Sequence, residues 1–130
     1  MSDLPESFIE AMQEQEFKYK QMSVTEADYK SAVERLLQVA HADTSSAYPA
    51  AQVLLSLYNG HDYHVDLCDL CTLDYDNLDA ALIAIRGRIF VSMEPHEVID
   101  DGDVVFRKLA EDWQHLHVAK RYAKKYDPNS

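Results

Sequence analysis

The chain has 130 residues and carries 12 lysines and arginines against 23 aspartates and glutamates, which gives a formal net charge of −11. This length predicts one domain, and the presence of only three glycines and four prolines favours helices over a turn-rich β fold. No apolar run approaches ~18 residues, which argues against a membrane-spanning helix. We therefore expect a single all-α domain of five or six helices, with an irregular segment around residues 60–74.

The N-terminal sequence and the cysteines indicate the compartment. The stretch MSDLPESF has neither the basic region nor the apolar region of a signal peptide. Two cysteines, three positions apart, are too few and too close for the disulfide framework of a secreted domain. We therefore expect a reduced, cytoplasmic protein.

The expected helices divide the chain into three parts. Residues 1–23 should form an N-terminal helix that could lie at the periphery, residues 24–117 the helical core domain, and residues 118–130 the basic end of the last helix and a tail. The first helix, over about 5–22, has apolar residues at helical spacing, although its polar second half, QEQEFKYKQ, should be exposed. These apolar residues are Phe8, Ile9, Met12 and Phe17.

The second helix should begin at a capping box formed by Ser23 and Glu26, or alternatively at Thr25 as N-cap, and should run to about Ala42. Its apolar stripe is Tyr29, Val33, Leu36, Leu37 and Ala40.

The third helix is the most apolar and is expected at the centre of the fold. It carries Pro49 in its first turn, where a missing N–H costs little. The pair Asn59-Gly60 predicts its end, with Gly60 in a left-handed conformation.

The irregular segment contains three leucines at three-residue spacing, Leu67, Leu70 and Leu73. This spacing predicts a short helical turn with the three leucines facing inward. Asp74 is expected to cap a helix over about 75–90. The predicted inward residues of that helix are Leu78, Leu82, Ile85 and Ile89.

A loop over 92–103 should lead to one long final helix, from Val104 to about Tyr126, with Asp103 as its N-cap. On this helix Trp113 and Leu116 could pack internally or pair with a second copy, so a homodimer is a possible arrangement. The basic residues at its end would complement the helix dipole; they are Lys120, Arg121, Lys124 and Lys125.

Two stretches, AVERLLQVAHADTSSAYPAAQVLLSLYNG at 32–60 and VDLCDLCTLD at 65–74, resemble a family of small bacterial proteins of unknown function. Members are often encoded on plasmids and integrative elements, so the resemblance implies an accessory factor of a mobile element, and it implies no activity, ligand or active site. Matching residues are Glu34, Arg35, Leu36, Leu37, Val39, Ala40, Asp43, Thr44, Leu54, Leu55, Tyr58, Asn59, Asp66, Leu67, Asp69, Leu70 and Asp74.

Histidines and cysteines cluster as H-x-x-H-x-x-x-C-x-x-C, formed by His61, His64, Cys68 and Cys71. These are the ligand types of a tetrahedral zinc site, so a zinc-binding domain is the alternative function. The family that the chain resembles more often has Thr and Trp at the cysteine positions, which implies that the cluster is no shared site. Partly buried structural cysteines are favoured over a zinc site or a redox pair, because nearby aspartates disfavour the thiolate.

Aspartates form two acidic segments. The simplest interpretation of these segments is a solvated surface. The first segment matches no calcium-binding loop, since it lacks the required glycine and glutamate spacing. With three scattered glycines, no phosphate-binding loop can form. We find no catalytic set and expect no enzyme and no cofactor. The predicted interaction residues are Asp62, Asp66, Asp69, Asp74, Asp76 and Asp79, with Asp100, Asp101 and Asp103.

The leading hypothesis is a small acidic, non-enzymatic interaction or regulatory protein. Its acidic surface would bind a basic protein partner, or occupy a site meant for nucleic acid. Direct nucleic acid binding is not expected, because the acidic body repels phosphates at long range.

Overall fold

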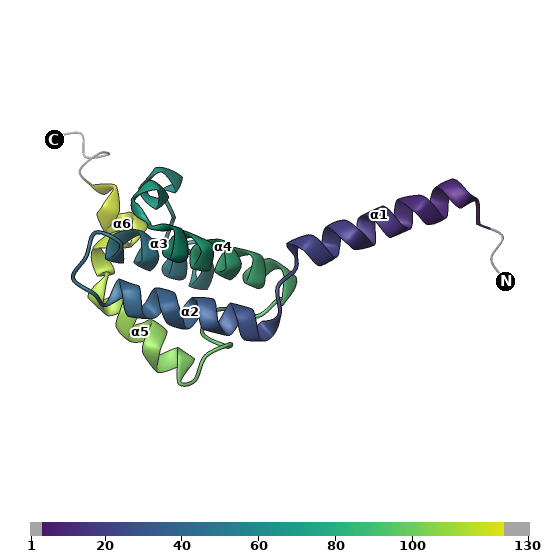
Figure 1. The fold of residues 1–130 in the computed structure, drawn as a ribbon. Helices are drawn as coiled ribbons and strands as arrows, with labels where there is room; N and C mark the ends of the chain where they lie inside the picture. The colour runs from purple at the N-terminus through teal and green to yellow at the C-terminus, as the bar shows by residue number, and fades with distance from the viewer. Residues whose placement is uncertain (1–3, 124–130) are drawn as a thin grey trace.

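The computed structural model describes residues 4–123, which fold into six α-helices and two short 3₁₀ helices without a strand (Figure 1). The all-α prediction is confirmed. None of these helices is both long and apolar enough to cross a membrane. The elements are α1 (Glu6–Met22), α2 (Glu26–Ala40), α3 (Ala47–Tyr58), η1 (Leu67–Thr72), α4 (Tyr75–Phe90), α5 (Gly102–Asp112), η2 (Gln114–Leu116) and α6 (Val118–Arg121).

Helix α3 lies at the centre of the body, as its apolar sequence predicts. Eight of its 12 residues are buried, and α2, α4, α5 and η1 all pack against it. The predicted stripe of α2 also faces the core, with Tyr29, Val33 and Leu36 fully buried. The prediction of a left-handed Gly60 was wrong, because no glycine in the described part of the chain has a positive φ.

Helix α4 has the predicted bounds but turns a different face to the core. Leu82 is 46% exposed and Ile89 is 64% exposed, so their predicted inward orientation was wrong. The buried residues of α4 are Asn77, Ala80, Ala81, Ala84 and Gly87. Small side chains allow α4 to approach α2 closely, which gives the most extensive helix contact of the fold and leaves the large aliphatic side chains partly outside.

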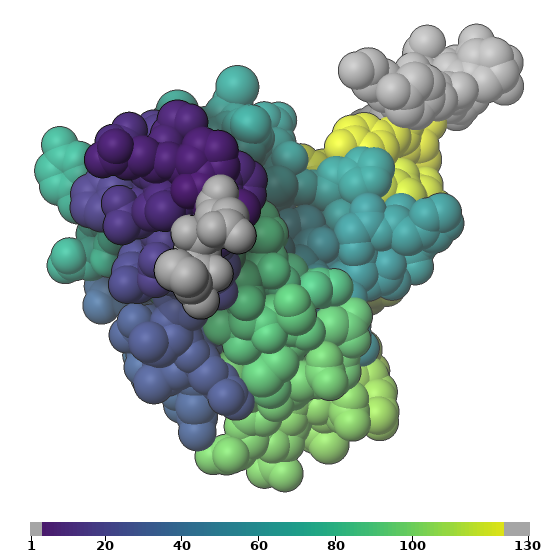
Figure 2. All heavy atoms as spheres, turned by 90° about the vertical axis from the view of Figure 1, so that its right-hand side faces the viewer, coloured from purple at the N-terminus to yellow at the C-terminus, as the bar shows by residue number. Residues whose placement is uncertain are grey.

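Helix α1 confirms the predicted N-terminal helix and projects away from the body (Figure 1). None of its residues is buried. Figure 2 looks at the molecule from the side on which α1 projects, and the purple atoms of α1 stand in front of the body. The three-residue connection to α2 contains the N-cap of α2, Thr25, whose Oγ1 accepts a hydrogen bond from the Asp28 amide at 3.0 Å. The alternative N-cap is thus confirmed, and the capping box at Ser23 was wrong.

The predicted long final helix is broken at Trp113, and its part beyond residue 123 lies outside the described residues. Trp113 and His117 both have non-helical backbone angles. The break lets Leu116 pack in the core, at 3% exposure, and lets the Val118 amide donate to the Asp62 carbonyl at 2.9 Å. Leu116 thus packs internally. The expected N-cap Asp103 was also wrong, because α5 begins after Asp101, whose side chain makes no capping hydrogen bond.

Candidate functional site

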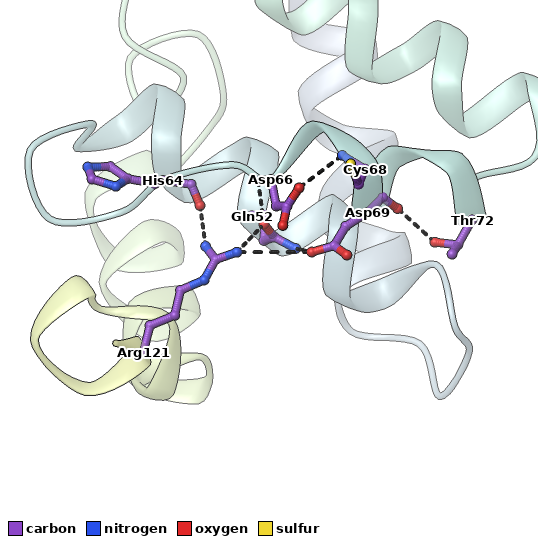
Figure 3. Close-up of polar contacts among 7 residues, drawn as sticks. All are labelled: Gln52, His64, Asp66, Cys68, Asp69, Thr72 and Arg121. Atoms are coloured by element: carbon purple, nitrogen blue, oxygen red, sulfur yellow. Dashed lines mark hydrogen bonds and ion pairs between the residues drawn. The ribbon is translucent and has the colours of Figure 1, made fainter. Parts of the chain in front are cut away.

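The irregular segment 61–74 is organised by a buried glutamine of α3 (Figure 3). Gln52 is 1% exposed, and its Oε1 accepts a hydrogen bond from the Asp66 amide at 2.8 Å. Its Nε2 donates to Oδ2 of Asp69 at 2.7 Å. A buried amide must find partners, since leaving it unpaired costs about 1–3 kcal/mol. Gln52 therefore fixes the position of η1 against the core.

Arg121 of α6 completes this cluster from the other end of the chain (Figure 3). Its Nη2 donates to Oε1 of Gln52 at 3.0 Å and lies 4.0 Å from Oδ2 of Asp69. Its Nη1 donates to the carbonyl oxygen of His64. The Arg121 side chain is 12% exposed, so it is a structural anchor rather than the dipole-complementing surface cation that the sequence predicted.

Four of the six aspartates of the first acidic segment have structural partners. Asp66 caps η1, accepting from the Cys68 amide at 2.9 Å, and Asp74 caps α4 as predicted, accepting from the Asn77 amide at 2.9 Å. Asp62 accepts from Nδ2 of Asn59 at 2.9 Å and lies 3.7 Å from Nε2 of His117. Asp69 accepts a hydrogen bond from Gln52. All four carboxylates are therefore engaged in contacts within the fold.

Asp76 and Asp79 behave differently. Both are exposed on the first turns of α4, and neither side chain makes a hydrogen bond or ion pair with a described residue. They line a groove of about 250 Å³ between α4 and α2, together with Asp28, Arg35 and the apolar residue Ile83. Nε of Arg35 donates to Oδ1 of Asn77 at 2.9 Å, so this cation is held at the groove by α4 itself.

The second acidic segment forms no comparable groove. Asp100 is 94% exposed and only approaches Lys30, at 4.0 Å. Asp103 is 78% exposed and lies 3.6 Å from Nε2 of His96. Asp101 has a left-handed backbone, with φ of 54°. The structure therefore keeps these three residues on the surface without bringing them to the other aspartates in one site.

The proposed zinc ligands do not come together. Among residues 4–123, no three His, Cys, Asp or Glu side chains lie close enough to hold a metal ion. The His64 ring points away from Cys68 (Figure 3) and lies near the ring of Tyr122, with centroids 6.4 Å apart. Cys68 and Cys71 are free and exposed, so the prediction that they are partly buried was wrong. In η1 it is Leu70 that faces the core, whereas Leu67 is 70% exposed.

Sequence reasoning missed Gln52, Arg121 and Asp28. A glutamine within the most apolar helix was the available signal for Gln52, since a polar side chain in a buried helix needs partners. Asp28 could not be found from spacing along the chain, because the groove joins two helices that are distant in sequence.

A model of a protein family of unknown function (DUF7673) matches residues 30–114. The chain belongs to this family. The DUF7673 region contains α3, η1, α4, α5 and residues 30–40 of α2, whereas α1, Asp28 and Arg121 lie outside it. No curated protein and no solved structure matches the chain significantly. Membership of DUF7673 brings no activity, so the groove must be interpreted from its own residues.

Proposed function

We propose that this DUF7673 protein is a small, non-enzymatic interaction or regulatory protein that binds a basic protein partner at the groove between α2 and α4. The observation that carries the proposal is the meeting of Asp28, Asp76 and Asp79 around one groove. Their three negative charges face the single positive charge of Arg35, so the groove has a local excess of negative charge.

The groove suits a lysine or arginine side chain of the partner. Its apolar lining is Ala32, Ala80 and Ile83, against which the aliphatic part of a long basic side chain could pack while its charged end reaches the carboxylates. Single exposed ion pairs contribute only about 0–1 kcal/mol. Binding therefore requires several basic residues, and the net charge of −11 would raise the association rate with such a partner.

A role in a mobile element is the finer form of this proposal. The resemblance to small proteins of plasmids and integrative elements supports an accessory function, in which the protein modulates a basic protein of the element or its host. A basic partner is favoured over nucleic acid, because the phosphates would meet the same carboxylates.

The test is a native pull-down from the producing cells, with mass spectrometry, that compares two triple variants. The groove variant is Asp28→Asn, Asp76→Asn and Asp79→Asn. The control variant, Glu34→Gln, Asp43→Asn and Glu111→Gln, removes the same charge from exposed positions outside the groove. We expect a basic protein to be retained by the wild type and the control variant and lost from the groove variant.

Salt dependence is the second arm of the test. Binding of the captured protein should weaken as ionic strength rises, because salt screens exposed charges. Equal capture by the two triple variants, or binding that persists unchanged at high salt, would refute the groove as the docking site.

A further inference from the structure

Helix α1 carries an apolar seam that the body contacts at Tyr19 but leaves largely exposed. Phe8, Met12, Gln15, Tyr19 and Met22 are spaced by four, three, four and three residues, which places them on one face of the helix, as in a two-heptad coiled-coil seam. The four apolar members are 49–56% exposed. We propose that this seam pairs with the α1 seam of a second copy of the chain, and that the two helices run antiparallel.

An isolated helix of this length has little stability of its own. Helices in proteins owe most of their stability to the packing of an apolar face, and short isolated helices are marginal in water. The only aromatic contact of α1 with the described body joins Tyr19 to Phe90 of α4, with ring centroids 5.5 Å apart. The other members of the seam therefore need a partner from outside this body.

The charges of α1 favour a second copy in the antiparallel direction. Lys18 and Lys20 form ion pairs with Glu14 and Glu16 of the same helix, at 3.2 Å and 3.3 Å. The charge left without an ion pair among the described residues is that of Glu6 and Glu10, in the first two turns. An antiparallel pair keeps these negative turns at opposite ends and opposes the two helix dipoles, whereas a parallel pair would place them side by side.

The same charge pattern disfavours folding of α1 onto its own body. The available surface is the outer stripe of α4, where Tyr75, Leu82 and Ile89 are 46–90% exposed. Since the Tyr19–Phe90 contact joins the C-terminal ends of the two helices, α1 could only fold back parallel to α4. Its glutamates would then lie over Asp76 and Asp79, and its lysines over Arg86 and Arg88.

Antiparallel pairing also extends the contact to α4. The first turn of the second copy's α1 would reach the end of α1 where Tyr19 meets Phe90, close to the exposed Ile89. The 17-residue helix is about 25 Å long, which gives an interface near the lower size limit of stable ones. The dimer should therefore dissociate on dilution.

Sedimentation equilibrium of the full chain tests the pairing. We expect the mass to rise from the monomer value of 14.9 kDa towards twice that value with concentration. Met12→Glu should weaken dimerisation at least about tenfold, because it places a charge within the seam. Phe17→Glu is the matched control, since Phe17 is 60% exposed but lies on the opposite side of α1, and it should leave dimerisation unchanged.

Disulfide cross-linking tests the direction in a background of Cys68→Ser and Cys71→Ser. An equimolar mixture of Phe8→Cys and Tyr19→Cys chains should form the mixed disulfide. A disulfide between two Phe8→Cys chains would overturn the antiparallel direction. A monomer mass even at about 1 mM, where a weak pair would be half associated, or equal effects of Met12→Glu and Phe17→Glu, would overturn the pairing itself.

Discussion

Gly87 of α4 lies directly against the ring of Tyr29 of α2. A Cβ at position 87 would lie 2.4 Å from Cγ of Tyr29, which is far closer than a real carbon contact. Helix propensity alone predicts that Gly87→Ala stabilises α4 by about 1 kcal/mol. We expect the opposite sign, a destabilisation of about 1–3 kcal/mol, because the ring is buried and has no space to move. Urea denaturation measures the difference.

The cause of that effect can be isolated with a second variant. Tyr29→Ala removes the ring but keeps Cβ of residue 29, which would lie 2.8 Å from a Cβ at position 87. In this background Gly87→Ala should therefore destabilise the protein less than it does in the wild type. If Gly87→Ala destabilised the protein equally in both backgrounds, contact with the ring of Tyr29 would not be the reason.

Tyr29 should also make stability depend on pH at the alkaline end. Burial raises the pKa of Tyr29 to about 12, and its hydroxyl donates to the Met93 carbonyl at 2.8 Å. A raised pKa means that the protonated form supports the fold. This contribution is complete below pH ~10, the pKa of an unfolded tyrosine, and is lost as pH rises towards 12.

Tyr29→Phe provides the measurement. At pH 8 we expect it to cost about 1 kcal/mol, through loss of the hydrogen bond, and the difference from the wild type should shrink as pH rises above 10. Tyr75→Phe is the control, because Tyr75 is 90% exposed. A difference between wild type and Tyr29→Phe that stayed constant from pH 8 to pH 11 would contradict the assignment.

Loss of Arg121 should loosen segment 61–74 specifically. Arg121→Met removes the hydrogen bonds to Gln52 and to the His64 carbonyl, and we expect a destabilisation of about 1–3 kcal/mol. Hydrogen exchange should become faster in residues 61–74 and remain unchanged in α2. Arg107→Met serves as the control, because Arg107 is exposed on α5. Equal stability of the two variants would show that the anchor contributes nothing.

The two thiols should react as exposed groups. Because Cys68 and Cys71 are both free and exposed, the native protein should release two equivalents of thionitrobenzoate from Ellman's reagent without denaturant. A chelator should leave the rate and the unfolding temperature unchanged. Bound zinc at one equivalent, with protection of both thiols, would instead restore the zinc-binding alternative.

The sequence predicts most helices correctly because apolar periodicity and caps are local signals. Asp74 and Tyr75 illustrate this, since cap and first helical residue were both as expected. The orientation of α4 could not be predicted in the same way. Burying Ala80, Ala84 and Gly87 instead of larger aliphatic residues depends on how closely α2 approaches, which is a tertiary property.

The candidate site was predictable only in part. Composition and spacing identified Asp76 and Asp79 as acidic surface residues, but also grouped with them aspartates that cap helices. Local sequence cannot separate an aspartate with a structural partner from one without, because the partners of Asp69 and Asp62 include Gln52 and His117 from other elements.

The bond between Arg121 and Gln52 joins residues 69 positions apart, and it bears on how the protein folds during synthesis. Helix α3 and segment 61–74 leave the ribosome well before α6. Until Arg121 emerges, the side-chain oxygen Oε1 of Gln52 lacks one of its two hydrogen-bond donors, and Asp69 lacks its nearby cation. The nascent chain can therefore form α2, α3 and α4 first, and the contacts of Arg121 with Gln52 and Asp69 form only after α6 has emerged.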